Sequence, residues 1–320
     1  MSEAANNQIR SAVLAVARME NRYLVEWIEY HLNLGFSHIF ICDNNFDHEE
    51  NIGEFLNTNL DSSLLNHVTV FNHRNDGSLH RQMHYYSNYL WKYKNDYDWI
   101  AIIDVDEFIT LSSESGLTSI NELLSRPEFS DADQLFLNWM VYGDNGLVEY
   151  DNSGVLKRFA VPAAISPKND QARINWHIKP IVNCHRLSAF PVFPCPHFMI
   201  GGKGHGGIKA ITASGIACKI DAFQKPDYAV AYIRHYLTKS ICEFMDRKIC
   251  GRSEYKNDGK ASITDFVSWI REFFDINEMT SEKFGIAVSY LVKYYTADEI
   301  SSALHELESL TQERKRALND

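Results

Sequence analysis

The hydrophobic pattern of the first hundred residues alternates between short apolar runs and helical stripes. Residues 12–17 (AVLAVA) form a continuous apolar run, which is typical of a strand covered on both faces. From Tyr23 the apolar positions follow a helical period, with Asn21 as the expected cap at the start and Gly35 at the end. Residues 38–42 (HIFIC) predict a second strand. A strand, a helix and a strand within about thirty residues predict a right-handed βαβ unit.

The same alternation continues to residue 103. Residues 52–56 and 79–93 carry helical stripes, and residues 68–71 and 99–103 (WIAII) read as strands. This succession predicts an α/β fold with a doubly wound, mostly parallel sheet. In such a sheet the ligand crevice lies beyond the carboxyl ends of the strands. Polar residues that directly follow each predicted strand therefore become candidates for a site.

The second half of the chain is less regular. Residues 135–141, 155–161 and 178–182 predict strands, and residues 191–207 predict a loop rich in proline, glycine and histidine. From residue 228 the pattern is helical nearly to the end, with breaks around 251–259 and near Asn277. We therefore expect one α/β domain over residues 1–250 and a helical extension over residues 251–320 packed on it.

Composition and charge narrow the class of protein. Hydrophobic residues make up 45% and charged residues 23%, as in a folded soluble protein. Thirty-one Lys and Arg against 42 Asp and Glu give a net charge of −11, which argues against binding nucleic acid through a broad basic face. The six cysteines form no C-x-x-C pair, and the first apolar run is too short for a signal peptide or a membrane span. We expect a cytoplasmic protein without a transmembrane segment.

The sharpest chemical feature is the pair Asp104 and Asp106, directly after the predicted strand WIAII. On an extended strand end, positions i and i+2 project to one face and Glu107 to the other. Carboxylates placed so suit Mg²⁺ or Mn²⁺, and an ion there would stabilise the charge on a departing diphosphate. Acidic pairs are also common at the ends of surface strands. The prediction of a metal site therefore depends on the position of this pair directly after a strand that is expected to be buried.

At these residues the chain resembles a known family. RMENRYLVEWIEYHLNLGFSHIFICDNN is similar to the opening of the glycosyltransferase 2/92-like group, that is, the bacterial "family 2_4" enzymes and their eukaryotic family 92 relatives. WIAIIDVDEFI resembles that group's D-x-D-E-F segment, and NWMVYGDNG, KPIV and IRHYLTKSICEFMDRKICG resemble further segments in the same order. One departure is visible, because the group's K-N-E reads Arg18-Met19-Glu20 here.

The resemblance implies a GT-A fold, a nucleotide-sugar donor, a divalent metal and inverting transfer. Position by position, it implies that Asp104 and Asp106 hold metal and diphosphate and that His235 completes the metal site. It also implies that Glu20 and Asp43 bind the nucleotide, and that Arg18 supplies the positive charge that the lysine of K-N-E carries in the group.

The residues themselves leave alternatives open. Asp43 in Asp-Asn-Asn fits an ordinary Asx turn as well as a ribose contact. His235, in an expected helix, would otherwise be a packing histidine. Lys179 and Lys239 can meet phosphate as point charges or be solvated. His197 is the next candidate ligand if the glycine-rich loop around it closes over the site, and otherwise belongs to a plain surface loop.

Inverting transfer needs a general base on the acceptor hydroxyl. We rank Asp144 first, because it follows the predicted strand that ends at residue 141, and Glu107 second. Trp139 and Tyr142 could stack on a sugar ring or belong to the core.

The expected function is a Mn²⁺- or Mg²⁺-dependent hexosyltransferase. By resemblance, the donor is a UDP-sugar, with galactose favoured, and the acceptor is a glycan or glycolipid in lipopolysaccharide or capsule synthesis, with peripheral contact to the inner membrane face as a possibility. The rivals are a nucleotidyl- or phosphotransferase and a non-catalytic binding module. Metal-dependent release of UDP from the donor alone would separate the transferase from the module.

Overall fold

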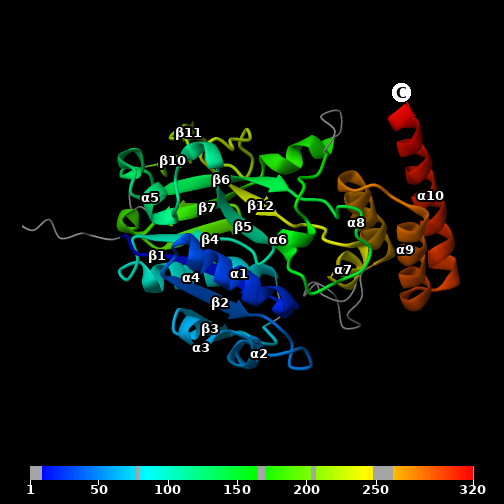
Figure 1. The fold of residues 1–320 in the computed structure, drawn as a ribbon, viewed down its shortest axis with the longest axis horizontal. Coiled ribbons are helices and arrows are strands. Elements are labelled where there is room, and N and C mark those ends of the chain that lie inside the picture. Colours follow the sequence, from blue (N-terminus) through cyan, green and yellow to red (C-terminus); the bar gives the residue numbers. More distant parts are fainter. Residues whose placement is uncertain (1–8, 77–78, 165–169, 203–206, 248–261, 320) are drawn as a thin grey trace, which may run out of the picture. The chain divides into compact units, whose positions relative to one another are not determined.

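The computed structural model describes the chain except residues 1–8, 77–78, 165–169, 203–206, 248–261 and 320 (Figure 1). Its contacts divide the chain into two compact units, one of residues 1–140 and 173–235 and the other of residues 141–172 and 236–320. The expected domain boundary at residue 250 lies outside the described residues. The second unit also includes residues 141–172, which the sequence pattern placed in the first domain.

The first unit is centred on a large sheet (Figure 1). Across it the strands follow the order β11 (Ala217–Cys218), β10 (Ala210–Thr212), β6 (Gln134–Val141), β7 (Ile178–Asn183), β4 (Trp99–Ile102), β1 (Ser11–Ala17), β2 (His38–Asp43) and β3 (Val68–Asn72). The pairs β4–β1, β1–β2 and β2–β3 are parallel, as is β6–β10, while β7 is antiparallel to both of its neighbours. The predicted α/β class with a mostly parallel sheet is confirmed.

Helices cover both faces of this sheet. The crossover from β1 to β2 contains α1 (Asn21–Leu34), and the crossover from β3 back to β4 contains α4 (Leu79–Tyr93). Because the two crossovers run in opposite directions and both are right-handed, their helices lie on opposite faces. On the α4 face, Tyr86 and Leu90 pack in one cluster with Leu14, Phe40 and Ile102. The remaining helices of the first unit are α2 (Ile52–Asn59), α3 (Ser62–Leu65) and α5 (Ile120–Leu124), with 3₁₀ turns at Ser113–Ser115, Pro127–Phe129 and Cys184–Arg186. A further 3₁₀ segment, Asp170–Trp176, has residues in both units.

The first helix shows how the local sequence sets its ends. It ends at Gly35 with φ 110°, a left-handed conformation in which glycine has no steric cost. The expected cap at Asn21 is wrong by one position. Glu20 is the N-cap and makes no side-chain cap bond, while the Asn21 side chain donates instead to the Glu50 carboxylate over 2.9 Å.

Three other sequence predictions were wrong in the second half. Residues 231–235 form β12 (Ala231–His235), antiparallel to β5 (Glu107–Leu111), where a helix was expected. Buried and half-buried residues alternate along β12 with the period of a strand. A segment of five residues is too short for this period to be recognised in the sequence, because the longer stretch around it has a helical period. Residues 155–158 form the short helix α6 (Val155–Arg158) instead of a strand, and the predicted loop contains the hairpin β8 (Pro191–Cys195) and β9 (Phe198–Gly201).

The second unit is mostly helical, as predicted for the C-terminal portion. Its helices are α6, α7 (Ile241–Met245), α8 (Ile263–Ile276), α9 (Ser281–Tyr294) and α10 (Ala297–Asn319). Phe266, Phe273 and Leu291 belong to its buried apolar cluster. The predicted break at Asn277 is confirmed, because this residue caps the C-terminus of α8.

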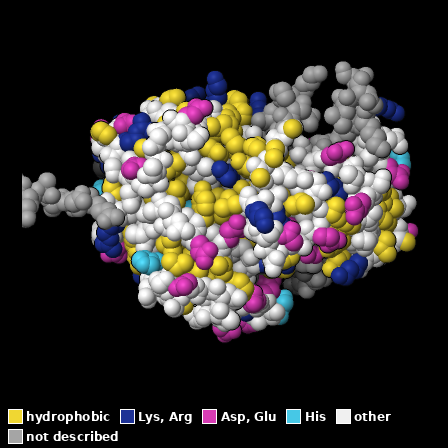
Figure 2. All heavy atoms as spheres, viewed as in Figure 1, with side chains coloured by type: hydrophobic (Ala, Val, Ile, Leu, Met, Phe, Trp, Pro, Cys, Tyr) yellow, Lys and Arg dark blue, Asp and Glu magenta, His cyan; other side chains and the backbone are white. Residues whose placement is uncertain are grey.

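Two surface properties bear on the class of protein. Among the described helices, none combines the length and the apolar composition needed to span a bilayer. On the face drawn in Figure 2, acidic and basic side chains of the described residues are interspersed, with apolar side chains gathered toward its upper part.

His31 is a buried titratable group in the core of the first unit. Its ring accepts a hydrogen bond from the Ile109 main-chain N–H at Nε2 over 3.3 Å, so Nδ1 carries the proton that it donates to the Trp27 carbonyl over 2.9 Å. The side chain is fully buried. Burial lowers the pKa of His31 to about 3, with the bond to the Trp27 carbonyl acting the other way.

We predict that this histidine contributes to acid sensitivity. Because its folded-state pKa lies below the unfolded value, the unfolded chain binds the extra proton, and stability falls as pH drops below about 6.5, by up to about 1.4 kcal/mol per pH unit. His31→Gln should be less stable at pH 7 but lose stability less steeply between pH 6.5 and 4.5 in urea denaturation. The exposed His48→Gln is the control and should follow the wild-type slope. Equal slopes for wild type and His31→Gln would contradict this role.

Candidate functional site

Residues 104–107 form a tight turn after β4 rather than the extended strand end expected from the sequence. β4 ends at Ile102, and the Glu107 N–H donates to the Asp104 carbonyl over 3.1 Å. The Asp104 N–H in turn donates to the Glu107 carboxylate over 2.9 Å. The turn therefore brings Glu107 back beside Asp104, whereas strand alternation would have placed it on the other face.

Lys179 joins these carboxylates from β7. Its Nζ lies 2.6 Å from Oδ2 of Asp104 and 3.5 Å from Oε2 of Glu107, and the side chain is 1% exposed. Burial opposes a charge on Lys179, but the neighbouring carboxylates outweigh it, so the pKa of Lys179 is raised. Burial also raises the pKa of Glu107 well above its ordinary value, although Lys179 acts in the opposite direction. The ammonium group of Lys179 is thus held by the Asp104 carboxylate, with the Glu107 carboxyl group beside it.

The second oxygen of Asp104 is also bonded. Oδ1 accepts hydrogen bonds from the Tyr86 hydroxyl at 3.2 Å and from the Gln82 amide at 3.3 Å, both on α4. Contacts from β7 and α4 therefore fix this carboxylate from two sides. Its side chain keeps 29% exposure, so it still borders solvent.

Asp106 faces His235 instead. Nε2 of His235 lies 3.7 Å from Oδ1 of Asp106, and both side chains are buried. His235 stands at the end of β12, paired in register with Glu107, rather than in the helix that the sequence predicted. An imidazole nitrogen beside a carboxylate oxygen is a donor pair that suits Mn²⁺. Among the described residues no three or more acidic, histidine or cysteine side chains are gathered for a metal. The pair alone would therefore supply only part of a coordination shell.

An aromatic wall adjoins this pair. The ring of Trp139, at the end of β6, lies 4.1 Å from His235, 4.6 Å from His177 and 5.3 Å from His197 between centroids. Burial lowers the pKa of His197 to about 3, and Nδ1 of the neutral ring contacts the Ile178 carbonyl at 2.8 Å. Trp139 therefore belongs to the site wall. Tyr142 lies in the second unit, where its ring is 5.0 Å from that of Tyr236.

The loops after β1 and β2 carry the residues expected to bind a nucleotide. Arg18 pairs with both oxygens of Glu49, at 2.9 and 3.2 Å, and its guanidinium lies 4.2 Å from the Phe46 ring centroid. Glu20 is buried at the start of α1. Asp43 accepts from the main-chain N–H groups of Asn45 and Ile52, each at 3.0 Å. The contact with Asn45 is that of an Asx turn. The roles of Arg18, Glu20 and Asp43 toward a ligand stay predictions.

Asp144 and Lys239 belong to the second unit. The Asp144 carboxylate forms a buried ion pair with Lys283 and accepts from the Gly146 N–H over 2.8 Å. Lys239 is buried with φ 55° and directly precedes Ser240, the N-cap of α7. Their predicted roles as base and as phosphate contact remain predictions.

Comparison with known proteins identifies the class. The model of glycosyltransferase family 92 matches residues 15–186, more than half of the chain, so the chain belongs to glycosyltransferase family 92. A glycosyltransferase family 92 protein of rice (Oryza sativa subsp. japonica) is 32% identical over 113 residues, which are 34% of this chain and 17% of that relative. The chain thus matches about a sixth of the rice protein's length. The narrower bacterial family 2 grouping stays a prediction.

Two solved structures are loosely similar. A structure of GalNAc-T7 with UDP, GalNAc and Mn²⁺ has a TM-score of 0.29 and 16% identity, over 44% of this chain and 24% of that one. The mannosyltransferase PcManGT from Pyrobaculum calidifontis, in complex with GDP-Man and Mn²⁺, has a TM-score of 0.38 and 9% identity, over 95% and 75% of the two chains.

Met19 adopts an unusual backbone conformation in the loop after β1. Its φ is 54°, in the left-handed region, and its N–H donates to the Asn45 side chain over 2.7 Å. Asparagine enters this region more readily than other non-glycine residues. The resembling group has asparagine at this position, so the conformation gives a reason for that asparagine and makes the methionine of Arg18-Met19-Glu20 the less favourable residue.

We predict that Met19→Asn stabilises the protein by about 1 kcal/mol, because it relieves the cost of the left-handed conformation. The measurement is the free energy of unfolding in urea. Met19→Leu keeps the steric cost and serves as the control, so it should match wild type. An asparagine variant no more stable than the leucine variant would show that the conformation carries no cost here.

Proposed function

We propose that this chain is a metal-dependent, inverting glycosyltransferase that moves a hexose from a UDP-sugar to a hydroxyl of a glycan or glycolipid. Membership of family 92 supports glycosyl transfer. The observation that carries the assignment of the site is the turn Asp104–Glu107, which lies inside the matched residues and beyond the carboxyl end of β4. In doubly wound sheets ligands bind at this edge.

The loops after β1 and β2 would receive the nucleoside. Arg18 and Glu20 belong to the loop after β1, and Asp43 is the last residue of β2. The two loops adjoin because Ala17 and Asp43 pair at the ends of the parallel strands β1 and β2. The diphosphate would then extend toward the turn after β4, the strand on the other side of β1. This order along one edge matches the linear order of nucleoside, diphosphate and sugar in the donor.

Asp106 and His235 would hold Mn²⁺ or Mg²⁺. When bound, this ion supplies positive charge that neutralises the diphosphate and stabilises the departing nucleotide. Two protein ligands leave the remaining positions to diphosphate oxygens and water, as is usual for ions that act on phosphates. Asp104 stands two residues earlier in the same turn, with Lys179 fixing its orientation through the 2.6 Å contact, and its role as a third metal ligand stays a prediction.

Trp139 offers an aromatic face beside His235 on which a sugar ring can pack. The general base stays a prediction, with Asp144 first and Glu107 second. Galactose as the transferred hexose, a role in lipopolysaccharide or capsule synthesis and a cytoplasmic site at the membrane face are parts of the proposal that derive from the resemblance.

Two substitutions test the metal pair. Asp106→Asn keeps the volume but removes the charge, and should lower turnover about a thousandfold while the fold survives. His235→Ala should raise the Mn²⁺ concentration needed for half-maximal activity by at least about tenfold, because even partners that only orient a metal ligand typically contribute that much. In both variants, the extra thermal stabilisation by UDP with Mn²⁺ over UDP alone should shrink.

Asp98→Asn is the matched control, since Asp98 precedes β4 at the opposite edge of the sheet and pairs there with His185. It should leave the Mn²⁺ titration unchanged. Superimposable titrations for His235→Ala and wild type, with melting lowered equally with and without UDP, would make His235 a core residue. Full activity of wild type in excess EDTA would end the metal hypothesis.

A further inference from the structure

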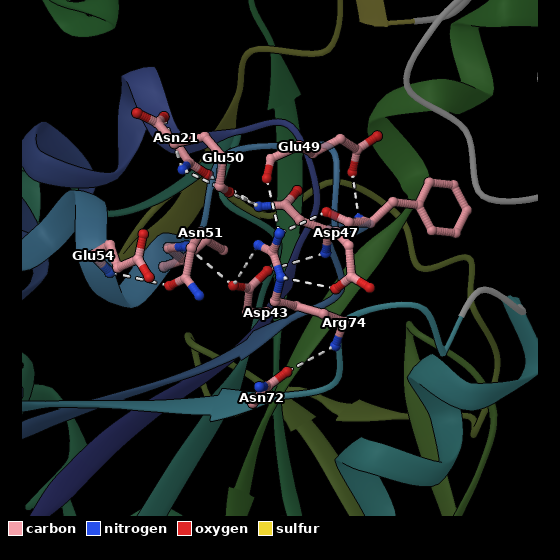
Figure 3. Close-up of polar contacts among 12 residues, drawn as sticks. Asn21, Asp43, Asp47, Glu49, Glu50, Asn51, Glu54, Asn72 and Arg74 are labelled. Atoms are coloured by element: carbon pink, nitrogen blue, oxygen red, sulfur yellow. Dashed lines mark hydrogen bonds and ion pairs between the residues drawn. The ribbon is translucent and has the colours of Figure 1, made fainter.

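The loop between β2 and α2, residues 44–51, is held by the side chains of two residues outside it (Figure 3). Asp43 precedes the loop at the end of β2, and Arg74 follows β3, the neighbouring strand. We call this segment the β2–α2 loop. It lies at the edge of the sheet where the proposed function places the nucleoside.

Asp43 fixes both ends of the loop. One carboxylate oxygen accepts from the Asn45 N–H and the other from the Ile52 N–H, each over 3.0 Å. Asn45 lies near the start of the loop, and Ile52 is the first residue of α2. The side chain is 2% exposed, so both oxygens are committed inside the protein.

Arg74 fixes the middle of the loop. Its Nη2 donates to the carbonyls of Phe46 at 2.7 Å and Glu49 at 2.8 Å, and Nη1 lies 3.6 Å from Oδ2 of Asp43. Figure 3 shows the guanidinium at the centre of these contacts. The side chain is 10% exposed. A planar guanidinium reaches several acceptors in fixed directions, which an ammonium group on a flexible stem does not.

The loop in turn sets the residues after β1. The Glu49 carboxylate accepts from Arg18 in a two-point contact, and the Asn45 side chain accepts from the Met19 N–H over 2.7 Å. A displaced β2–α2 loop would therefore release Arg18 and Met19 as well. The three loops that follow β1, β2 and β3 form one connected assembly.

We propose that Asp43 and Arg74 are positioning residues that hold the β2–α2 loop in the conformation that receives the nucleoside, and that neither touches the ligand. This inference rests on the proposed function. It replaces the expected direct contact of Asp43 with a contact made through the loop. Loss of either residue should weaken ligand binding in the ground and transition states alike, and so raise KM with little change in kcat.

The test measures binding of uridine and of UDP with Mn²⁺ by calorimetry, for wild type, Arg74→Lys and Arg74→Ala. We expect the Kd of both ligands to rise by the same factor in each variant, about tenfold or more, since two charge-assisted bonds are lost or misdirected. With the UDP-sugar, kcat should change less than about threefold. Millimolar guanidinium should restore UDP affinity to Arg74→Ala in part.

A double-mutant cycle with Asp43→Asn and Arg74→Lys adds a second criterion. If both act through the same loop, the double variant should lose less affinity than the product of the two single losses. Arg81→Ala is the control, because Arg81 is an exposed arginine of α4 paired with Asp76. It should bind uridine and UDP as wild type does and gain nothing from guanidinium.

Several outcomes would overturn the inference. A loss seen for UDP but not for uridine would mean that Arg74 contacts the diphosphate directly. Unchanged affinity in a variant with a lowered melting temperature would make the network purely structural. A folded wild type that binds neither uridine nor UDP would overturn the proposed function together with this inference, whereas the first two outcomes leave the proposed function intact.

Discussion

The candidate site depends on one buried ammonium group. Lys179 reaches the carboxyl edge of the sheet only because β7 runs antiparallel between β4 and β6, so its early residues meet the ends of its neighbours. A buried charge without a partner is strongly unfavourable, and here Asp104 supplies a carboxylate oxygen at 2.6 Å, with the Glu107 carboxyl group at 3.5 Å. Removing Asp104 would leave the ammonium poorly compensated. The tight turn after β4 and the place of Lys179 therefore require each other, and Asp106 faces His235 within that frame.

Two polar assemblies share the edge and divide the proposed work between them. At the β1–β3 end, Arg18, Glu49 and Arg74 bond mainly to one another and to the main chain, which fixes loop shape before a ligand arrives. At the β4 end, Nε2 of His235 lies 3.7 Å from Oδ1 of Asp106, and this is the pair that the proposal assigns to a cation. Preorganised loops reduce the entropy lost on binding. In the proposal, an ion held by Asp106 and His235 would also bind the diphosphate, so that the two would bind together.

The first hundred residues were predictable because their apolar runs are long and their helices are amphipathic, so strand ends and candidate positions followed directly. Where a tertiary contact decides the structure, the sequence pattern was insufficient. The five residues of β12 are a strand because β5 pairs with them, and this put His235 on a strand instead of a helix. Asp104 and Glu107 meet through a turn that Lys179 stabilises from 75 residues away. Arg74 had a positional signal, directly after a strand, but its bonds go to carbonyls that no side-chain pattern encodes.

The central claim is that the edge beyond β1, β2 and β4 binds a UDP-hexose and breaks its bond to the diphosphate with the help of a divalent ion. The most direct measurement incubates the protein with UDP-hexoses, UDP-galactose first, and follows free UDP over time with Mn²⁺ and with EDTA. The account predicts slow UDP release without an acceptor, which EDTA abolishes and a suitable glycan acceptor accelerates. Tight binding of UDP-hexoses without any release, or turnover that forms or consumes pyrophosphate instead, would contradict it.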